Sequence, residues 1–392
     1  MPAPSRLIVI ILGIFTALAP LAIDMYLPAL PQMQTDFAAS STQVQITLAA
    51  FLAGFALGPA LYGPISDGWG RKGPLYAGLI IHTLSSLACM MAPSVEIFTI
   101  ARFFQAIGAC SGGVIGRAMV RDLYPPQETH RVYATLMLVM GAAPIIAPLA
   151  GAWLINLLGW RSIFATQAIM GGLCLVLLHH WLAESHPPHL RRRSGFIGAL
   201  VAYGRLLADR SFMAYALAGS FGMAGLFTYI SGSPFVLIQY HNLPLEQFSW
   251  VFAANAFGFI IAGQINGRVL HGLDRHKVLA VAQWAQLALA AMLAAVAASD
   301  FAGVIGLSVA LFATIACMGF IAPNSSVLVM APRGGAIAGT ASALMGMLQF
   351  TIGAAASALV GLLHAHSALP MAMVMLGFAV LGPLSLKLLP KG

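Results

Sequence analysis

The sequence predicts an all-α integral membrane protein with twelve transmembrane helices in two six-helix bundles related by pseudo-twofold symmetry. Hydrophobic residues make up 60% of its 392 residues and charged residues only 8%, whereas soluble domains carry about 25% charged residues. Long apolar runs recur along the whole chain, and a helix needs about 20 residues to cross the bilayer core. This composition excludes a soluble globular protein, and the high hydrophobicity excludes a disordered one.

The apolar runs are separated by gaps in which charged residues, proline and glycine gather. Because lipid offers the backbone no hydrogen-bond partners, each run must be a helix. The first run follows Arg6 as a secretory signal would, but no small-residue cleavage site follows it, so we interpret it as a span. We expect twelve spans, at 7–30, 44–65, 75–92, 97–119, 131–154, 162–182, 212–232, 247–269, 278–298, 302–325, 337–362 and 368–387.

Charges in the gaps predict the orientation. With the N-terminus inside, every Lys and Arg except Arg102 and Arg161 falls on the cytoplasmic side. Acidic residues mark the other side, at Asp36, Glu96, Glu246 and Asp300. This separation indicates a multi-pass protein of the bacterial inner membrane with both termini in the cytoplasm. The net charge of +8 is scattered in ones and twos, so no nucleic-acid partner is expected.

The longest polar interruption, at 184–209, predicts a cytoplasmic linker between an N-terminal bundle, 1–183, and a C-terminal bundle, 210–392. It opens with prolines and with three consecutive arginines, Arg191, Arg192 and Arg193. Beside Arg205, apolar and aromatic residues then recur at helical spacing, at Phe196, Leu200, Tyr203 and Leu207. Two interpretations stay open: a short helix on the inner membrane face, or a solvated linker.

The two halves carry corresponding polar loops. Residues 67–72 join spans two and three, and residues 274–277 join spans eight and nine. Equal halves with matching loops suit a transporter built from two bundles that rock around a site at the middle of the membrane.

The sequence shows no motif typical of an enzyme active site or of a metal site. Cys89, Cys110, Cys174 and Cys317 lie inside apolar runs without CxxC spacing, so we expect buried thiols and no disulfide or metal site. No nucleotide-binding loop, HExxH motif or Ser/His/Asp grouping occurs in a suitable context. The sequence therefore predicts neither an enzyme nor a cofactor.

Asp24 and Arg102 are the charges that lie deepest in the predicted spans. A charge there costs at least about 2.5–3.5 kcal/mol, so each should face a partner or a wet cavity. In one interpretation Asp24 binds the coupling proton, burial favours its protonation, and Arg102 opposes it. In the other, a static ion pair holds spans one and four together.

The loop at 63–72 (GPISDGWGRK) offers a candidate conformational gate, formed by Gly63, Asp67, Gly70, Arg71, Lys72 and Asp122. Arg71 can bridge Asp67 to Asp122, and Asp67 can accept hydrogen bonds at a helix N-terminus. We expect this cluster to form when the halves close on the cytoplasmic side. The basic residues would also set the topology without any gate.

Two further patterns concern helix geometry. In span five, glycines and prolines share one face of the helix, at Gly141, Pro144, Pro148 and Gly151. This pattern predicts either a hinge or close helix packing. In span one, Pro20 and Pro28 flank Asp24 and predict a discontinuous helix beside a site.

Aromatic, amide and Met side chains within the spans are candidates for the wall of an apolar pocket with few polar groups. Such side chains also commonly pack or face lipid. The candidates are Tyr26, Gln105, Met140, Phe221, Tyr229, Asn255, Phe259 and Asn324. His82, in span three, is expected to be a hydrogen-bonded packing residue.

Several of these segments resemble the major facilitator superfamily. Residues 63–72 resemble its signature loop, although Gly68 departs from the usual large or basic residue. Residues 102–108 (RFFQAIG) resemble its second motif, and 141–151 (GAAPIIAPLAG) resemble its antiporter motif with two glycine positions replaced. The resemblance implies the twelve-helix fold and a transporter.

A narrower resemblance rests on 23–31 (IDMYLPALP), 119–125 (MVRDLYP), 224–235 (AGLFTYISGSPF) and 338–342 (AGTAS). These segments are similar to the bicyclomycin-resistance (Bcr/CflA) branch of proton-coupled drug exporters. The resemblance implies efflux of small, varied drugs in exchange for protons, and we expect the protein to be a monomer. A metabolite permease of the same fold, for an amino acid or a sugar, is the alternative, and a receptor without transport is a third.

Overall fold

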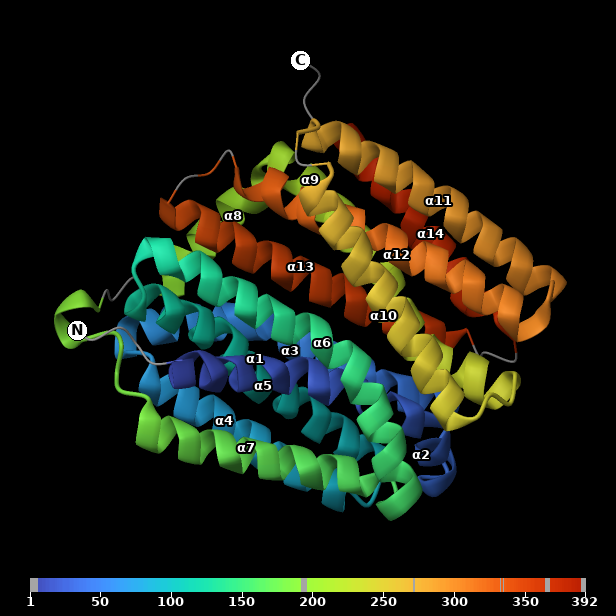
Figure 1. Cartoon of the computed structure of the whole chain (residues 1–392), viewed down its shortest axis with the longest axis horizontal. Coiled ribbons are helices and arrows are strands. Elements are labelled where there is room, and N and C mark those ends of the chain that lie inside the picture. The colour runs from blue at the N-terminus through green and yellow to red at the C-terminus, as the bar shows by residue number, and fades with distance from the viewer. Residues whose placement is uncertain are drawn as a thin grey trace. The chain divides into compact units, whose positions relative to one another are not determined.

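All regular elements in the described part of the chain are helices, as the computed structural model shows (Figure 1). The structure describes residues 6–191, 196–270, 272–331, 333, 335–363 and 367–388. Arg192 and Arg193 of the predicted linker lie outside the described residues. The chain forms two compact units: unit 1 is Met1–Ala29 with Ala50–Ala199, and unit 2 is Leu30–Ala49 with Leu200–Gly392.

Each unit is a bundle of long helices. Unit 1 holds most of α3 and five other long helices, with bounds α1 (Arg6–Asp24), α3 (Ser41–Trp69), α4 (Lys72–Met91), α5 (Val95–Leu123), α6 (Pro126–Leu158) and α7 (Arg161–Trp181). Unit 2 holds α2 (Leu30–Asp36), most of α8 (Phe196–Ala208), α9 (Arg210–Ser233), α10 (Leu245–Arg268), α11 (Arg275–Ser299), α12 (Gly303–Met330), α13 (Gly335–Leu362) and α14 (Leu369–Ser385).

Short helical turns extend some of these elements. A 3-10 turn, Leu27–Ala29, joins α1 to α2, and a π-helix, Pro234–Tyr240, continues α9. Two more 3-10 turns lie at Pro188–Leu190 and Leu386–Leu388.

Twelve helical segments in the described residues are long and apolar enough to cross a membrane, which confirms the predicted number. Several extend beyond the predicted bounds. For example, α6 has 33 residues, about 50 Å at the α-helical rise, whereas the prediction gave 131–154. Hydropathy marks only the stretch that lipid must solvate, while backbone hydrogen bonding carries the helix on into the polar region.

The same packing pattern occurs in both units. In unit 1, α1 contacts α5, α6 and α7, while α4 contacts α5 and α7. In unit 2, α9 contacts α12, α13 and α14, while α11 contacts α12 and α14. The second set is the first with each helix replaced by its counterpart six spans later. The two units therefore share one internal packing pattern.

The division into units differs from the predicted bundles in two places. Residues 30–49 group with unit 2, and the boundary in the linker falls between Ala199 and Leu200, inside α8. Within unit 2, α2 packs against the π-helix. The Thr42 hydroxyl also donates to the carbonyl oxygen of Gly361 at 2.6 Å.

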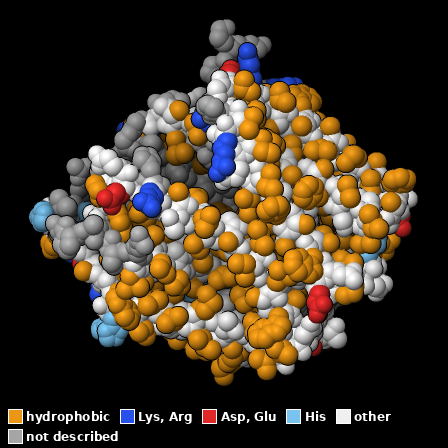
Figure 2. All heavy atoms as spheres, in the orientation of Figure 1, with side chains coloured by type: hydrophobic (Ala, Val, Ile, Leu, Met, Phe, Trp, Pro, Cys, Tyr) orange, Lys and Arg blue, Asp and Glu red, His pale blue; other side chains and the backbone are white. Residues whose placement is uncertain are grey.

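The outside of the molecule is apolar. Figure 2 shows a face on which hydrophobic side chains cover most of the area and charged ones are few. Large side chains are widely exposed; Leu138, Trp153 and Ile305 are 73%, 64% and 71% exposed. Because water would disfavour so much apolar surface, these side chains are suited to contact lipid. The four cysteines are buried and free, as predicted from their apolar neighbours.

Candidate coupling and binding site

Asp24 is the last residue of α1 and is only 4% exposed. After it the chain turns through the 3-10 segment that contains Pro28, and α2 follows. The predicted break in span one is therefore confirmed. Gly151 of α6 packs against the backbone of Met25, where a side chain would collide with the carbonyl group. The break is thus enclosed by closely packed backbone.

Arg102 of α5 is completely buried. Its Nη1 donates to the carbonyl oxygen of Ala22 at 3.0 Å and to Oε1 of Gln105 at 2.6 Å. The guanidinium carbon lies 4.1 Å from the centroid of the Tyr26 ring and 4.3 Å from that of Phe51. Aromatic faces attract a cation at these distances. Arg102 is therefore held by a carbonyl group of α1 and by the Tyr26 ring in the turn that follows α1.

The Asp24–Arg102 ion pair, one of the two interpretations of the sequence, is not formed in this structure. No ion pair within 4.0 Å involves Asp24 or Arg102 among the described residues. The Nε and Nη2 atoms of Arg102 are buried, and nothing in the described part of the chain accepts a hydrogen bond from them. The sequence predicts similar depth for the two residues, but depth does not fix the direction of a side chain around its helix axis.

Gln105 is the centre of a buried amide network in unit 1. Its Nε2 donates to Oγ of Ser86 at 2.8 Å and to Oε1 of Gln167 at 2.7 Å. Gln167 in turn donates to the carbonyl oxygen of Leu21 at 3.5 Å. His82 hydrogen-bonds through Nδ1 with the Gln105 carbonyl oxygen at 3.4 Å, as expected of a packing residue. The network thus joins α1, α4, α5 and α7.

The candidates in unit 2 form separate pairs. Asn255 donates to the Tyr229 hydroxyl at 2.8 Å, and the Tyr229 ring stacks on Phe252 with a centroid distance of 5.4 Å. Asn324 donates to Oδ1 of Asn266 at 2.6 Å. These buried amides have the partners that a membrane interior requires.

The remaining pocket candidates are less buried than these. Phe221 stacks on Phe378, with ring centroids 6.2 Å apart. Met140 and Phe259 are partly buried, and no hydrogen bond or ring contact joins them to the other candidates in the described residues. The structure therefore brings together Tyr26, Arg102 and Gln105 in unit 1, and Tyr229 and Asn255 in unit 2.

Among the buried glutamines that sequence reasoning missed, three donate a hydrogen bond to a backbone carbonyl group of another helix. Besides Gln167, they are Gln283 and Gln286 of α11, which donate to the carbonyl oxygens of Ala218 at 2.8 Å and Gly222 at 3.2 Å. The Oε1 atoms of Gln283 and Gln286 lack a hydrogen-bond partner in the described part of the chain. An amide in the middle of an apolar run was the available signal, because such a group needs a partner in lipid.

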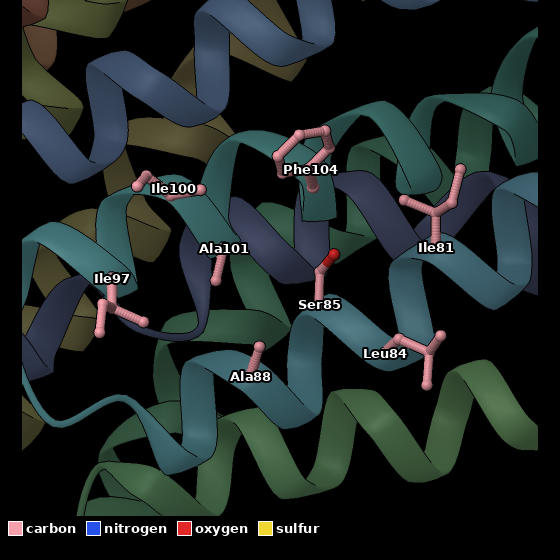
Figure 3. Close-up of a pocket in the computed structure, with 8 residues that line it drawn as sticks. All are labelled: Ile81, Leu84, Ser85, Ala88, Ile97, Ile100, Ala101 and Phe104. Atoms are coloured by element: carbon pink, nitrogen blue, oxygen red, sulfur yellow. The ribbon is translucent and has the colours of Figure 1, made fainter.

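An apolar groove of about 460 Å³ lies between α4 and α5. Figure 3 shows its lining side chains on the two facing helices. Leu84 and Ile100 in its wall are each 60% exposed, so it belongs to the exterior of the bundle. Its one polar lining residue is Ser85, and none of the predicted site residues lines it.

The candidate gate is a charge network inside unit 1. Arg71 is 1% exposed; its Nε donates to Asp122 at 2.8 Å and its Nη1 to Asp67 at 2.5 Å and to Ser66 at 2.9 Å. Burial acts to lower the pKa of Arg71, but the hydrogen bonds to Asp122 and Asp67 outweigh it and raise that pKa. The predicted bridge is present, and all its members belong to one unit, whereas we expected it to require closure between the halves.

Glu184, which sequence reasoning left in the linker, completes this network. Its carboxylate accepts hydrogen bonds from the backbone N–H of Arg71 at 2.8 Å and of Lys72 at 3.2 Å. Burial acts to raise the pKa of Glu184, but bonds from the Arg71, His186 and Lys72 N–H groups lower it overall. A carboxylate at the start of α4 also suits the positive end of the helix dipole.

The glycines and lysine of the loop have distinct surroundings. Gly70 has φ +96°, and a Cβ there would lie 2.8 Å from Nη2 of Arg191 and close to the Glu184 carboxylate. Gly63 faces open space. Lys72 reaches the carbonyl oxygen of His179 at 3.4 Å. Only Gly70 is therefore required by both conformation and space.

The Gly/Pro face of span five lies on an unbroken helix. Pro144 and Pro148 are inside α6, which continues to Leu158. Gly151 packs closely against the backbone of Met25, the residue that follows the end of α1. The packing interpretation is thus supported by the direct contacts at Gly151.

The sequence profile of the Major Facilitator Superfamily matches residues 12–358. The chain belongs to the major facilitator superfamily. It is therefore a transporter rather than an enzyme, and its twelve apolar helices make it a multi-pass membrane protein.

Relatives of this transporter include proteins associated with drug resistance. An uncharacterised MFS-type transporter, YdgK, of Bacillus subtilis is 34% identical over 381 residues, 96% of this chain and 93% of the relative. A bicyclomycin resistance protein homolog of Haemophilus influenzae is 29% identical over 371 residues, 94% and 92% of the two chains. The resemblance seen in the motifs is confirmed by this second relative.

The crystal structure of a D-xylose–proton symporter has a TM-score of 0.77 to this transporter at 16% identity, and the match covers 98% of each chain. At this level of identity the similarity concerns the fold. It confirms the predicted all-α architecture of the superfamily.

Proposed function

We propose that this transporter exports small amphipathic antibiotics, similar to bicyclomycin or chloramphenicol, from the bacterial cytoplasm in exchange for protons. The relationship to a bicyclomycin resistance protein homolog supports the substrate class. The protein would act as a monomer in the inner membrane, with both termini in the cytoplasm. Protons are the coupling ion, and no cofactor takes part.

The observation that carries the proposal is the buried, unpaired Asp24. The residue is 4% exposed, and no described cation lies within ion-pair distance of its carboxyl group. A buried carboxylate without a counter-ion is costly, and taking up a proton removes that cost. Asp24 therefore binds a proton in this state and releases it where water or Arg102 can stabilise its charge.

Arg102 is the partner that varies between states. Here it is bonded to Ala22, two residues before Asp24 in α1, and to Gln105. A shift of α1 relative to α5 by a few ångströms would replace the carbonyl contact by a contact with the Asp24 carboxylate. Drug binding against Tyr26, which covers the guanidinium, would bias that exchange and so link the drug to the proton.

The drug would bind to aromatic and amide groups. Tyr26 and Gln105 in unit 1, and Tyr229 and Asn255 in unit 2, combine apolar rings with single hydrogen-bonding groups. Such surfaces suit ligands that are largely apolar with few polar atoms. In the same proposal the Asp67–Arg71–Asp122 network acts as the gate, and the Gly/Pro face of α6 allows that helix to bend.

A metabolite permease is the second candidate, and one observation favours it. The Nε and Nη2 donors of Arg102 have no acceptor in the described residues, and a carboxylate binds such a pair of donors well. A small carboxylate substrate, such as an amino acid, would occupy them.

Proteoliposomes with an imposed pH gradient test these candidates. Addition of bicyclomycin or chloramphenicol should drive proton movement across vesicles that contain the native protein. Proton movement should be absent with Asp24→Asn and close to the native level with His82→Ala. His82 is the matched control because it is also buried, and in the described part of the chain its side chain hydrogen-bonds only with a backbone carbonyl group. Unchanged coupling in Asp24→Asn would disprove the assignment. Proton movement driven by amino acids and not by drugs would favour the permease, and no flux of either would indicate a receptor.

A further inference from the structure

Helix α8 has an apolar face whose large side chains are about half exposed in the described part of the chain. Leu200, Val201 and Leu207 are 51%, 49% and 46% exposed, whereas Leu206 is 6% exposed. At 3.6 residues per turn, the three exposed residues share one side of α8, and Leu206 points the opposite way. Leu206 therefore attaches α8 to the bundle and leaves the other face uncovered.

Helix α8 lies beside the ends of the membrane spans of unit 2. It ends at Ala208, and the membrane span of α9 begins at Arg210. Leu206 belongs to a core cluster with Val329, at the end of α12, and Ala341, at the start of α13. Figure 1 shows α8 beside these helix ends. An element at that depth lies where hydrocarbon gives way to headgroups and water.

Basic residues border the apolar face. Arg205 and Arg210 are exposed, and no carboxylate in the described residues lies within 4.0 Å of either. Asp209, between them, is already engaged: it pairs with Arg333 and caps α9 through the N–H groups of Ser211 and Phe212. The two arginines are thus left as net positive charge beside the exposed leucines.

We propose that α8 lies in the membrane interface, with Leu200, Val201 and Leu207 inserted among lipid chains and with Arg205 and Arg210 bound to anionic phospholipid headgroups. An apolar strip bordered by arginine, at the depth of the headgroups, has the composition of an interfacial helix. Lipid phosphates supply the negative charge that the protein itself does not provide there. This surface is independent of the proposed drug and proton sites.

The depth of α8 is measured on the full-length transporter in vesicles of phosphatidylethanolamine and phosphatidylglycerol. Because the native cysteines are buried, a single new exposed cysteine can be labelled selectively with an environment-sensitive fluorophore. The label at Leu207→Cys should emit at short wavelength and be quenched by lipids brominated in the acyl chain. The matched control is Gly272→Cys, in the loop before α11, where nothing lies within 4 Å; its label should report water. Emission at position 207 equal to that at position 272 would overturn the proposal.

The headgroup preference is measured with the same label. Replacing brominated phosphatidylcholine by brominated phosphatidylglycerol at equal mole fraction should strengthen quenching at position 207. The preference for the anionic lipid should fall roughly 5-fold for each arginine removed in Arg205→Gln and Arg210→Gln. The charge-matched variant Arg275→Gln, at the start of α11, should leave quenching at position 207 unchanged. Equal quenching by the two lipids, with both arginines present, would overturn the assignment of anionic lipid. The assignment would also be overturned if, in detergent without lipid, a second copy of the chain shielded the label at position 207 from water.

Discussion

Replacing Arg71 by glutamine should destabilise unit 1 more than any comparable loss of charge at the helix ends. The substitution removes the cation that Asp67 and Asp122 share, and glutamine is too short to reach both carboxylates. The Asp122 side chain is only 13% exposed, while that of Asp67 is 47% exposed. The consequence is an unpaired carboxylate in a mostly buried position.

The magnitude follows from these exposures. Removing one partner of a buried ion pair costs about 3–5 kcal/mol, whereas an exposed pair contributes about 0–1 kcal/mol. Asp122 therefore accounts for most of the loss and Asp67 for little. We expect Arg71→Gln to lower the free energy of unfolding by about 3 kcal/mol, or about 6–12 °C in melting temperature for a unit of this size.

A thiol-reactive dye provides the assay, because unfolding exposes the buried cysteines, three of which lie in unit 1. Lys72→Gln is the control, since it removes the same charge at the next position. In a double-mutant cycle, Arg71→Gln combined with Asp122→Asn should lose less stability than the two single changes added together. Strict additivity, or a shift in Arg71→Gln no larger than that of the control, would refute the reasoning.

Three further variants have defined outcomes. Gly151→Ala should impair both transport and thermal stability, because its Cβ collides with the Met25 backbone, whereas Gly113→Ala, with nothing within 4 Å, should be neutral or gain up to about 1 kcal/mol. Gln105→Leu removes three buried hydrogen bonds and should cost about 2 kcal/mol in the same dye assay. The lowered pKa of Glu184 stabilises the fold at neutral pH, so the melting-temperature advantage over Glu184→Gln should be full above about pH 5 and shrink as the pH falls below about 4.3.

Each of these three has a contrary result. Equal stability of the two alanine variants would contradict the close packing at Gly151. A Gln105→Leu protein as stable as the native one would mean that Ser86 and Gln167 find new partners. A difference between native protein and Glu184→Gln that persists undiminished to low pH would show that the cap does not depend on the ionised carboxylate.

The features visible in the sequence are those that depend on one helix at a time. Hydropathy defines the twelve spans because each must satisfy its own backbone in lipid. Prolines on both sides of Asp24 predict the break in span one, since they remove backbone donors locally. The bridge from Arg71 to Asp67 was also accessible, because these residues are four apart near the end of α3 and the start of α4.

Features that depend on how helices rotate against each other were out of reach. Asp24 and Arg102 were expected at similar depth, yet Arg102 points to the Ala22 carbonyl and the Tyr26 ring. Its partner is decided by the rotation of α1 against α5, which packing of the whole unit determines. The glutamines of the network are visible in the sequence, but their partners could not be predicted. An amide in a membrane span indicates that a hydrogen-bond partner exists without showing which residue it is.

The capping of α4 by Glu184 also has a consequence for biosynthesis. Arg71 and its cap are 113 residues apart, so the ribosome completes the cap roughly 6–23 s after it has made Arg71, at the usual roughly 5–20 residues per second. Throughout that interval the start of α4 has its amide hydrogens unbonded to Glu184. Since Glu184 directly follows α7 and precedes α9, its arrival coincides with the end of synthesis of the first six spans. The contact therefore acts as a closing step that the nascent chain can take only when the whole first bundle is present.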